Sequence, residues 1–422
     1  MLLFALLACT TSPSSSKSDC SEGGAGDLHL TLSLPDEDWE TPPALAVYSS
    51  VGERVATVTE ADRTLSLDSG VYTLVALRGT TAPEGVRTGE AFGLLHDTVQ
   101  TVCLSDGETV EWGATWEEQP SSGKLWVTSG ETAYAFEAAE LADGRVTPAW
   151  SITVPSSNDL RGFAIDPMGD LWIATSPTYG ARLVVYPPDG LDPVELSGDS
   201  LPADLQLQDL EFAPDGSLWA LVSGSATGEV GLRAWSPAQA AAFLAKGALP
   251  LAPARTVTVD GMIAPEDCAF DPDGTLWIAD FGGNQVLRVD LSTEDSVLTP
   301  VDAFTAGWKD GTGDHSLDGP TALGVDDEGR LWVNYWTSLT VARFDGTSSS
   351  AVARSPDLRV GSDVLDLPAG LALDHAGGAW FGDETQDGVG HLLAVDQGSG
   401  DASVDATSDE ALVPTDLVFD PR

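Results

Sequence analysis

The chain has 422 residues, of which 66 are acidic and 19 basic, and its formal net charge at pH 7 is −47. So strong a negative field repels nucleic acids and anionic lipid surfaces, which excludes both as expected partners. The length is enough for about two domains with sizeable cores.

The N-terminal residues are apolar and are followed by a Ser-rich polar segment. The apolar run ends at Leu7, Ala8 and Cys9. It is too short to span a bilayer, and a small residue precedes the cysteine. This pattern resembles the end of a bacterial lipoprotein signal. The resemblance implies a signal over residues 1–8, acylation of Cys9 and a flexible tether over residues 9–26.

This resemblance also implies a location. We expect an outer-membrane or cell-surface lipoprotein of a bacterial cell envelope, attached to the membrane only by its lipid anchor, with a plain secreted protein as the alternative. Cys20 and Cys103 are candidates for a disulfide in an oxidising compartment, although the remaining cysteines leave the pairing open. Cys268 falls in a predicted inner strand, where we expect a small buried side chain.

Residues 27–112 contain seven short segments with alternating apolar residues, separated by Gly and Asp turns. Such segments predict a small β-sandwich. The run LSLDSGVYTLVAL, with Gly70, Tyr72 and Leu74, resembles a strand of prealbumin-like modules. The resemblance implies a spacer or adhesion module without chemistry of its own. Residues 113–122 form the predicted linker.

One phrase recurs through residues 123–422, and its fullest copy reads PEDCAFDPDGTLWIADFGGNQVLRVDL at 265–291. It predicts three short strands joined by tight turns. The tryptophan of the phrase recurs at intervals of 46 to 58 residues, at positions 126, 172, 219, 277, 332 and 380. Such intervals are typical of propeller blades.

The sixth copy of the phrase is divided between the ends of this region. Residues 123–127 hold only its second half, and residues 415–422 hold only its first half. We therefore predict an all-β chain with a small β-sandwich domain followed by a six-bladed β-propeller, whose last strand closes the first blade. Two insertions add short helices to this prediction. One begins at Ser236 and Pro237 and ends at Gly247, and the other falls within residues 136–148.

The recurring phrase resembles the six-bladed NHL-like, TolB-like and gluconolactonase-type propellers over about 300 residues. The families of this group share a fold but include hydrolases, lyases, sugar and peptide binders, and scaffolds. The resemblance therefore implies the fold and leaves the function open.

Candidate site residues gather at one face of the predicted disc. Strands one and two of a blade are antiparallel, so residues before strand one and after strand two share the face at the mouth of the central channel. Converging carboxylates repel one another unless a cation or protons intervene. The candidates on this face are Arg161, Asp209, Glu266, Asp267, Asp280, Asp383 and Asp416.

Hard oxygen ligands suit Ca²⁺. The resemblance to metal-dependent gluconolactonases implies an ion at this face, and Glu266 matches their ligand pattern. We take Glu266 and Asp267 as the metal-ligand hypothesis. The alternative is that Asp280 and its counterparts accept hydrogen bonds from the backbone and hold the turns.

Three further candidates are not carboxylates. Tyr335 and Trp336 follow a second strand and could stack on a sugar or a peptide, with loop packing as the alternative. His315 lies in the loop at 308–320 on the same face, and it is either a catalytic residue, as lyase-like propellers of the group imply, or a solvated turn residue.

The sequence contains none of the common enzyme signatures, so no catalytic residue is assigned. We predict a monomeric, envelope-anchored lipoprotein whose propeller is a binding or scaffolding platform. Its expected partner is a protein, peptide or carbohydrate at the channel face. The alternative is a Ca²⁺-assisted hydrolase or lactonase with Glu266 and Asp267 at the ion.

Overall fold

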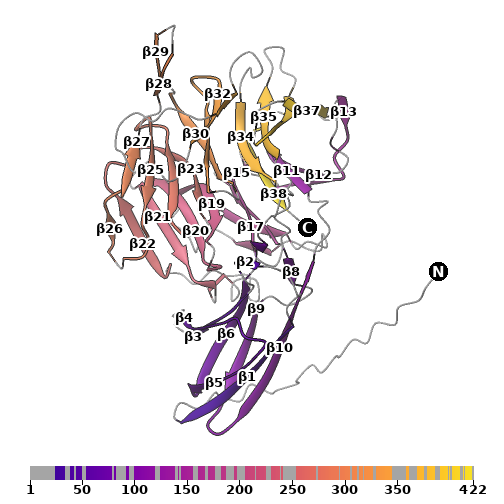
Figure 1. The fold of residues 1–422 in the computed structure, drawn as a ribbon, viewed down its shortest axis with the longest axis vertical. Helices are drawn as coiled ribbons and strands as arrows, with labels where there is room; N and C mark the ends of the chain where they lie inside the picture. The colour runs from indigo at the N-terminus through magenta and orange to yellow at the C-terminus, as the bar shows by residue number, and fades with distance from the viewer. Residues whose placement is uncertain are drawn as a thin grey trace, which may run out of the picture.

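A computed structural model describes residues 24–420 with gaps, of which the longest are residues 82–91, 241–252 and 345–357. The predicted signal, Cys9, Cys20 and most of the predicted tether lie outside the described residues. The described chain consists almost entirely of strands (Figure 1). No helix within it is long and apolar enough to cross a membrane.

Two four-stranded sheets form first, below the ring of sheets in Figure 1. Leu28, Leu30 and Leu32 alternate along the first strand and are buried against the second sheet, as their spacing predicts. Tyr72 closes one end of this core, and its hydroxyl donates to the Asp68 carbonyl at 2.8 Å. The first sheet holds β5 (Asp62–Asp68), β1 (Ala25–Ser33), β10 (Thr109–Glu118) and β8 (Phe92–Leu94). The second holds β4 (Arg54–Val58), β3 (Ala44–Ser49), β6 (Gly70–Leu77) and β9 (Val99–Leu104), and β2 (Trp39–Thr41) pairs separately with β7 (Thr80–Thr81).

Six further sheets follow in the described chain, each with four antiparallel strands in succession, and we number them blades 1 to 6. Their innermost strands contact one another in a closed ring. The prediction of an all-β chain with a β-propeller is confirmed. From the innermost strand outward, blade 1 is β38 (Asp416–Asp420), β11 (Lys124–Ser129), β12 (Thr132–Glu137) and β14 (Trp150–Thr153); blade 2 is β15 (Leu160–Ile165), β16 (Leu171–Thr175), β17 (Arg182–Tyr186) and β18 (Val194–Leu196). Blade 3 is β19 (Leu205–Phe212), β20 (Leu218–Gly224), β21 (Val230–Trp235) and β22 (Arg255–Val259); blade 4 is β23 (Pro265–Phe270), β24 (Leu276–Asp280), β25 (Gln285–Val289) and β27 (Asp302–Phe304). Blade 5 is β30 (Pro320–Val325), β31 (Leu331–Tyr335), β32 (Thr340–Phe344) and β33 (Leu358–Val360); blade 6 is β34 (Pro368–Leu373), β35 (Gly378–Glu384), β36 (Gly390–Asp396) and β37 (Ala402–Ser408).

Two pairings hold blade 1 in the ring. β38 is antiparallel to β11, with Leu417 opposite Val127 and Phe419 opposite Leu125, as the divided copy predicts. The hydroxyls of Thr128 and Thr415 lie 2.7 Å apart beside this pairing. In addition, β13 (Gly144–Val146) leaves blade 1 and pairs in parallel with β37 of blade 6. The first blade is thus tied to the last by two separate segments.

The structure explains why an aspartate and a tryptophan recur together in the phrase. In blade 2, the Asp166 carboxylate accepts the Asp170 N–H at 2.9 Å and the Trp172 indole N–H at 3.0 Å. The same pair of bonds recurs from Asp326 in blade 5 and from Asp374 in blade 6. One aspartate therefore closes the turn and orients the tryptophan, which packs against the next blade.

The two helix predictions have different outcomes. Ser236 is an N-cap, because its Oγ accepts the Gln239 N–H at 3.3 Å while the Gln239 side chain accepts the Ser236 N–H at 3.0 Å. The helix begins at Pro237 as predicted, and residues 241–247 lie outside the described residues. The helix predicted within residues 136–148 is wrong at both ends, because Phe136 continues β12 and residues 144–146 pair with β37. Pairing with an available sheet edge overrides a weak local helix preference there.

Two small additions lie outside the four-stranded pattern. β26 (Val297–Leu298) pairs in parallel with β22 at the edge of blade 3. β28 (Gly307–Asp310) and β29 (Gly313–Ser316) form a hairpin between blades 4 and 5, which projects from the ring in Figure 1.

Candidate functional site

The innermost strands of blades 2 to 6 each carry a β-bulge or similar irregularity near their start. In β19, β23 and β30 the extra residues are Gln208, Glu266 and Thr321. A bulge places two consecutive residues opposite one and so re-aims the side chains beside it. All these bulges lie where the innermost strands begin, at the face that we call the mouth face.

The residue after the bulge is aspartate in two blades. Asp209, Asp267 and Asp416 each pair with the residue two positions after the tryptophan of their blade, so they lie at the same height in the channel. Ala322 holds this position in blade 5. These four residues stand at one level, and three of them are acidic.

Two glycines complete this level of the channel. A Cβ added at Gly162 would lie 2.4 Å from the Asp209 Cα, and one added at Gly370 would lie 2.9 Å from the Asp416 Cα. Real Cβ atoms do not approach a neighbouring backbone so closely, so only glycine allows the adjacent blades to come together here. At this level three aspartates thus share the channel with three very small residues.

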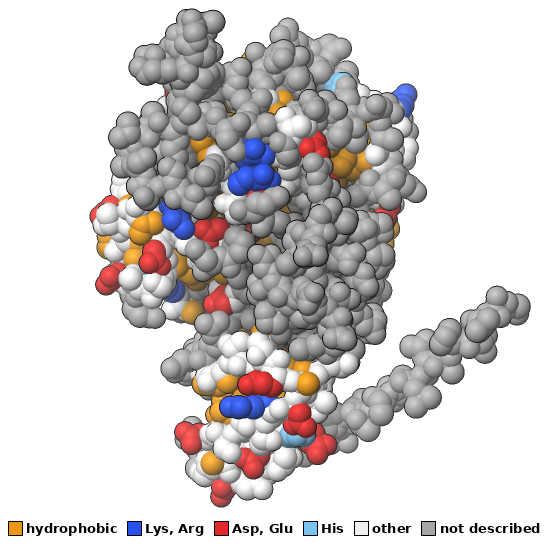
Figure 2. Space-filling model, viewed as in Figure 1, with side chains coloured by type: hydrophobic (Ala, Val, Ile, Leu, Met, Phe, Trp, Pro, Cys, Tyr) orange, Lys and Arg blue, Asp and Glu red, His pale blue; other side chains and the backbone are white. Residues whose placement is uncertain are grey.

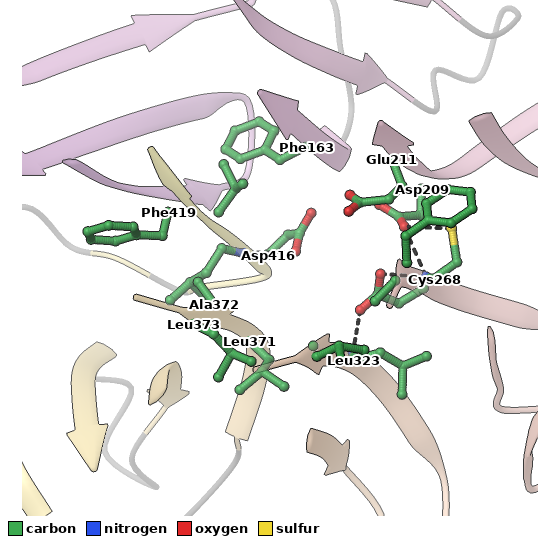
Figure 3. A pocket seen from close by; sticks show the side chains of 17 residues that line it. Phe163, Asp209, Glu211, Cys268, Leu323, Leu371, Ala372, Leu373, Asp416 and Phe419 are labelled. Atoms are coloured by element: carbon green, nitrogen blue, oxygen red, sulfur yellow. Dashed lines mark hydrogen bonds between the residues drawn. The ribbon is translucent and has the colours of Figure 1, made fainter. Parts of the chain in front are cut away.

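A cavity of about 190 Å³ occupies the channel at this level. Glu211, two residues beyond Asp209 on the same strand, also lines it. Asp209 and Glu211 point their carboxyl groups toward the centre from one side, and Asp416 points from the other (Figure 3). Most of the remaining wall is apolar, and it includes Phe163, Leu323, Leu371, Val418 and Phe419.

The three aspartates bind the backbone of neighbouring blades. Asp209 accepts the Cys268 N–H at 3.0 Å and the Cys268 thiol at 3.3 Å. Asp267 accepts the Leu323 N–H at 2.5 Å. Asp416 likewise accepts the Phe163 N–H. Each aspartate therefore satisfies a backbone donor of the next innermost strand, and this bond joins the two blades.

Asp209 and Asp267 are also hydrogen-bonded to each other. A carboxylate is only an acceptor, so this bond requires a proton on one of the two groups. Burial raises the pKa of Asp209 to about 8, and burial with the nearby Asp267 charge raises the pKa of Asp416 to about 8. These shifts favour the protonated form of the channel carboxyl groups near neutral pH.

Glu211 differs from the three aspartates. Burial and the nearby Asp267 and Asp416 charges hold the pKa of Glu211 well above its usual range. Within the described part of the chain, its carboxyl group has no hydrogen-bond or ion-pair partner. Sequence reasoning missed Glu211. The available signal was its place two residues after Asp209 in a predicted strand, where the side chains share a face.

Arg161 and Glu266 stand at the mouth face, outside the cavity lining. The Arg161 guanidinium and the Glu266 carboxylate are 3.6 Å apart and partly exposed. Burial raises the pKa of Glu266, and the Arg161 charge opposes this shift. Of the two residues in the metal-ligand hypothesis, Glu266 thus faces a cationic side chain, and both Asp267 oxygens accept backbone N–H groups. Among the described residues, no group of three or more His, Cys, Asp or Glu side chains could hold a metal ion.

The other candidates do not line the cavity. Asp280 is fully buried and accepts the Ala264 N–H at 2.8 Å and the Gln285 amide at 2.8 Å, so it holds the segment leading into β23. Asp383 is buried in β35. Tyr335 is buried against Phe344, with ring centres 6.4 Å apart, and burial raises the pKa of its hydroxyl.

Trp336 and His315 are also absent from the cavity lining. Trp336 is 48 % exposed. His315 stands opposite Trp308 in the β28–β29 hairpin. Cys103 is disulfide-bonded, whereas Cys268 is a buried free thiol. Cys20, the predicted partner of Cys103, lies outside the described residues.

Comparisons with known proteins agree with this fold. A family model described as "Strictosidine synthase-like, N-terminal" matches residues 250–288, which include β23 and β24. No sequence among curated proteins matches the chain. A structure of a protein of unknown function from Bacteroides caccae is 13% identical, covers 72% of this chain and 100% of its own, and has a TM-score of 0.50.

Two other similar structures are a nidogen/laminin complex and TolB from Acinetobacter baumannii. The first is 12% identical, covers 71% of this chain and 98% of that chain, and has a TM-score of 0.48. The second is 13% identical, covers 72% and 68%, and also has a TM-score of 0.48. At these identities the likeness concerns the fold alone. The chain thus contains a β-propeller.

Proposed function

We propose that this chain is a binding protein whose propeller channel takes up a positively charged group of its ligand. The observation that carries this proposal is the convergence of four carboxyl groups from β19, β23 and β38 in one cavity. Carboxyl groups held together in this way resist ionisation, and a cation entering among them releases the bound protons and relieves the repulsion.

The chemistry of the wall favours an organic cation. An ammonium group donates three hydrogen bonds and can be satisfied by two or three carboxylates. Calcium needs six to eight oxygen ligands, and several oxygens here already accept backbone N–H groups. Phe163, Leu323 and Leu371 offer apolar surface to an alkyl stem next to the charge. A primary amine on a slender carbon chain fits this combination.

The setting of the site belongs to the same proposal. The chain is an extracytoplasmic lipoprotein of the bacterial envelope, acylated at Cys9, in which the N-terminal sheets serve as a spacer and the propeller acts as a monomeric platform. Support comes from the N-terminal sequence pattern and from the acidic composition, which keeps the chain away from polyanions. Acidic side chains are visible over both the lower sheets and the ring in Figure 2.

The test is calorimetric titration with n-butylammonium chloride at pH 7, in two buffers of different ionisation enthalpy. We expect binding with proton release, and at least a tenfold loss of affinity in Glu211→Gln and in Asp267→Asn. Asp260→Asn, at an exposed carboxylate outside the cavity, is the matched control and should bind normally. Equal binding of neutral 1-butanol would show that the channel does not recognise charge.

A second candidate function is a Ca²⁺-assisted hydrolase or lactonase. The observation in its favour is that Asp209 and Asp267 are neighbouring buried carboxyl groups in one cavity, where burial raises the pKa of each. A panel of lactones, assayed with and without calcium chloride, tests it. Turnover that disappears in Asp267→Asn would support this candidate, and calcium-dependent turnover lost in Glu266→Gln would place an ion at the mouth.

A further inference from the structure

One position of each innermost strand pairs with the tryptophan of the recurring phrase. Glu211 holds this position in blade 3, opposite Trp219. In the other five blades the residue at this position is uncharged and is small or aliphatic. These residues are Ala164, Ala269, Gly324, Ala372 and Val418. Glu211 is therefore the one departure from the repeat at this level, which we call the glutamate tier.

The fold gives no reason for a carboxyl group at Glu211. Asp209, Asp267 and Asp416 each accept a backbone N–H of a neighbouring blade. The buried Glu211 carboxyl group has no such partner within the described part of the chain. It points into the cavity instead (Figure 3). Enclosing an ionisable group without a partner costs free energy, so its place here favours a role in binding a ligand.

Glu211 lies farther from the mouth face than the aspartates. We call the level of Asp209, Asp267 and Asp416 the aspartate tier. Glu211 is two residues beyond Asp209 on β19, so its side chain leaves the same face of the strand. A strand rises about 3.3 Å per residue, which separates the two tiers by roughly 6 to 7 Å. The channel thus carries two levels of carboxyl groups along its length.

The wall between the two tiers is apolar. On four strands, the residue between the tiers lines the cavity with an apolar side chain. These residues are Phe163, Leu323, Leu371 and Leu417. A short chain of methylene groups that joined two charged ends would therefore contact apolar surface along its length.

The two tiers are bounded at both ends. Toward the mouth face, Arg161 comes directly before Gly162, and its guanidinium lies 3.6 Å from the Glu266 carboxylate. The Arg161 charge opposes a further cation on that side. On the other side, the next residues of the cavity lining are all apolar, and they are Phe270, Val325, Leu373 and Phe419. The lining contains no charged side chain beyond those of the two tiers, so it offers partners to two cationic groups.

We propose that the channel binds a short α,ω-diamine, with one ammonium group among the carboxyl groups of the aspartate tier and the other at Glu211. An extended chain of four methylene groups places its two nitrogens roughly 6 Å apart, because each bond advances about 1.25 Å along the chain. This length matches the separation of the tiers. The inference rests on the proposed function, since the first ammonium group is the one that the channel takes up, and it adds a second charge that a monoamine lacks.

The experiment compares n-butylammonium with 1,4-diaminobutane, which has the same carbon chain, by calorimetric titration of the full chain at pH 7. We expect the diamine to bind at least tenfold more tightly than the monoamine. Glu211→Gln should abolish this difference, whereas Asp267→Asn should weaken both ligands by a similar factor. 1,8-Diaminooctane should bind less tightly than 1,4-diaminobutane, because its second charge would reach the apolar wall beyond Glu211. Glu131→Gln, at an exposed carboxylate outside the cavity, is the matched control and should leave both affinities unchanged.

The possible failures can be told apart. Equal affinity of the two ligands for the natural chain, or a diamine advantage that survives Glu211→Gln, overturns the second ammonium site. A preference for 1,8-diaminooctane does the same, because it places the second charge beyond Glu211. If n-butylammonium still binds in these cases and responds to Asp267→Asn, the proposed function stands without the diamine. If neither ligand binds the natural chain, the proposed function falls as well.

Discussion

Three blades of the ring place an aspartate at one level of the channel and three place a very small residue there, although all are built from the same repeat. Blades 1, 3 and 4 place Asp416, Asp209 and Asp267 at one level, whereas Ala322 of blade 5 holds the equivalent position. Gly162 and Gly370, from blades 2 and 6, lie directly against the aspartates of their neighbours. The repeat therefore preserves the buried tryptophan while the channel position varies freely from blade to blade.

The small residues at this level are as necessary as the acidic ones. Gly162 leaves room for Asp209, and Gly370 leaves room for Asp416. Each aspartate in turn satisfies a backbone N–H of the following blade. A symmetric ring of six aspartates would leave no room at the level and would gather more mutually repelling carboxyl groups than the three present here. The asymmetry creates an off-centre site for a charge.

The largest expected effect on stability comes from adding a side chain at one of the glycines of the channel level. Gly162→Ala places a Cβ within 2.6 Å of three backbone atoms of β19, which cannot move without disturbing blade 3. We expect a loss of about 3 kcal/mol in the free energy of unfolding. Thermal and urea denaturation measure it. Gly70→Ala, with its closest neighbour at 3.8 Å, is the control and should change stability by less than about 1 kcal/mol. Equal stability of the two variants would contradict the close approach of the blades.

The second effect concerns pH. Aspartates in an unfolded chain titrate near about pH 4, whereas burial raises the pKa of Asp209 and Asp416 to about 8. Between these values the folded state binds more protons than the unfolded state, so stability falls as pH rises from about 4 to about 8. The slope is at most about 1.4 kcal/mol per pH unit for each group, and less for the half-buried Asp416.

Urea denaturation at several pH values checks this dependence. The double variant Asp209→Asn/Asp416→Asn separates the channel from the general negative charge of the chain. It should show a flatter dependence than the natural chain across this window, and the two chains should differ most at the alkaline end. An unchanged slope in the double variant would mean that these carboxyl groups do not hold protons in the folded state.

A smaller effect is expected at Glu211. Because Glu211 has no bonding partner among the described residues, Glu211→Gln removes repulsion without breaking a hydrogen bond. We expect a gain of about 1 kcal/mol at pH 8 and almost none at pH 4, where the glutamic acid is already neutral. Glu131→Gln, at an exposed turn of blade 1, should be neutral at both pH values. Destabilisation by Glu211→Gln at pH 8 would indicate a favourable contact of the carboxylate instead.

The smallest expected effect is on the reaction rate of the Cys268 thiol, which lies next to Asp209. Burial, and then the Asp209 and Asp267 charges, hold the pKa of Cys268 well above its usual range, so it should react with N-ethylmaleimide far more slowly than an unfolded cysteine. Asp209→Asn removes only a secondary cause of this shift. We expect about a threefold faster reaction at pH 8, measured by mass spectrometry. A rate that equals the natural rate would show that burial alone protects the thiol.

The sequence predicted where the candidate site lies, but not all of the residues that line it. Asp209, Asp267 and Asp416 were expected to meet at the channel, and the structure places all three around the cavity. Glu266, Asp280 and Asp383 were grouped with them. In the structure Glu266 pairs with Arg161, and Asp280 holds the segment leading into β23. Asp383 is buried in β35. A one-residue bulge decides which of two consecutive side chains faces the channel, and no spacing in the sequence shows where a bulge falls.

The sequence alone predicted the repeat and the β-propeller, because the turn aspartate and the tryptophan that it bonds lie within a few residues of each other. These local bonds form in blades 2, 5 and 6, and in blade 3 the Trp219 indole N–H donates to the nearby Ser217 hydroxyl instead. The divided sixth copy of the phrase predicted the return of the last strand to the first blade. The three-dimensional arrangement of the blades was needed to show that Glu211 joins the aspartates and that Gly162 and Gly370 make room for them. These relations join different blades, and they exist only once the ring has closed.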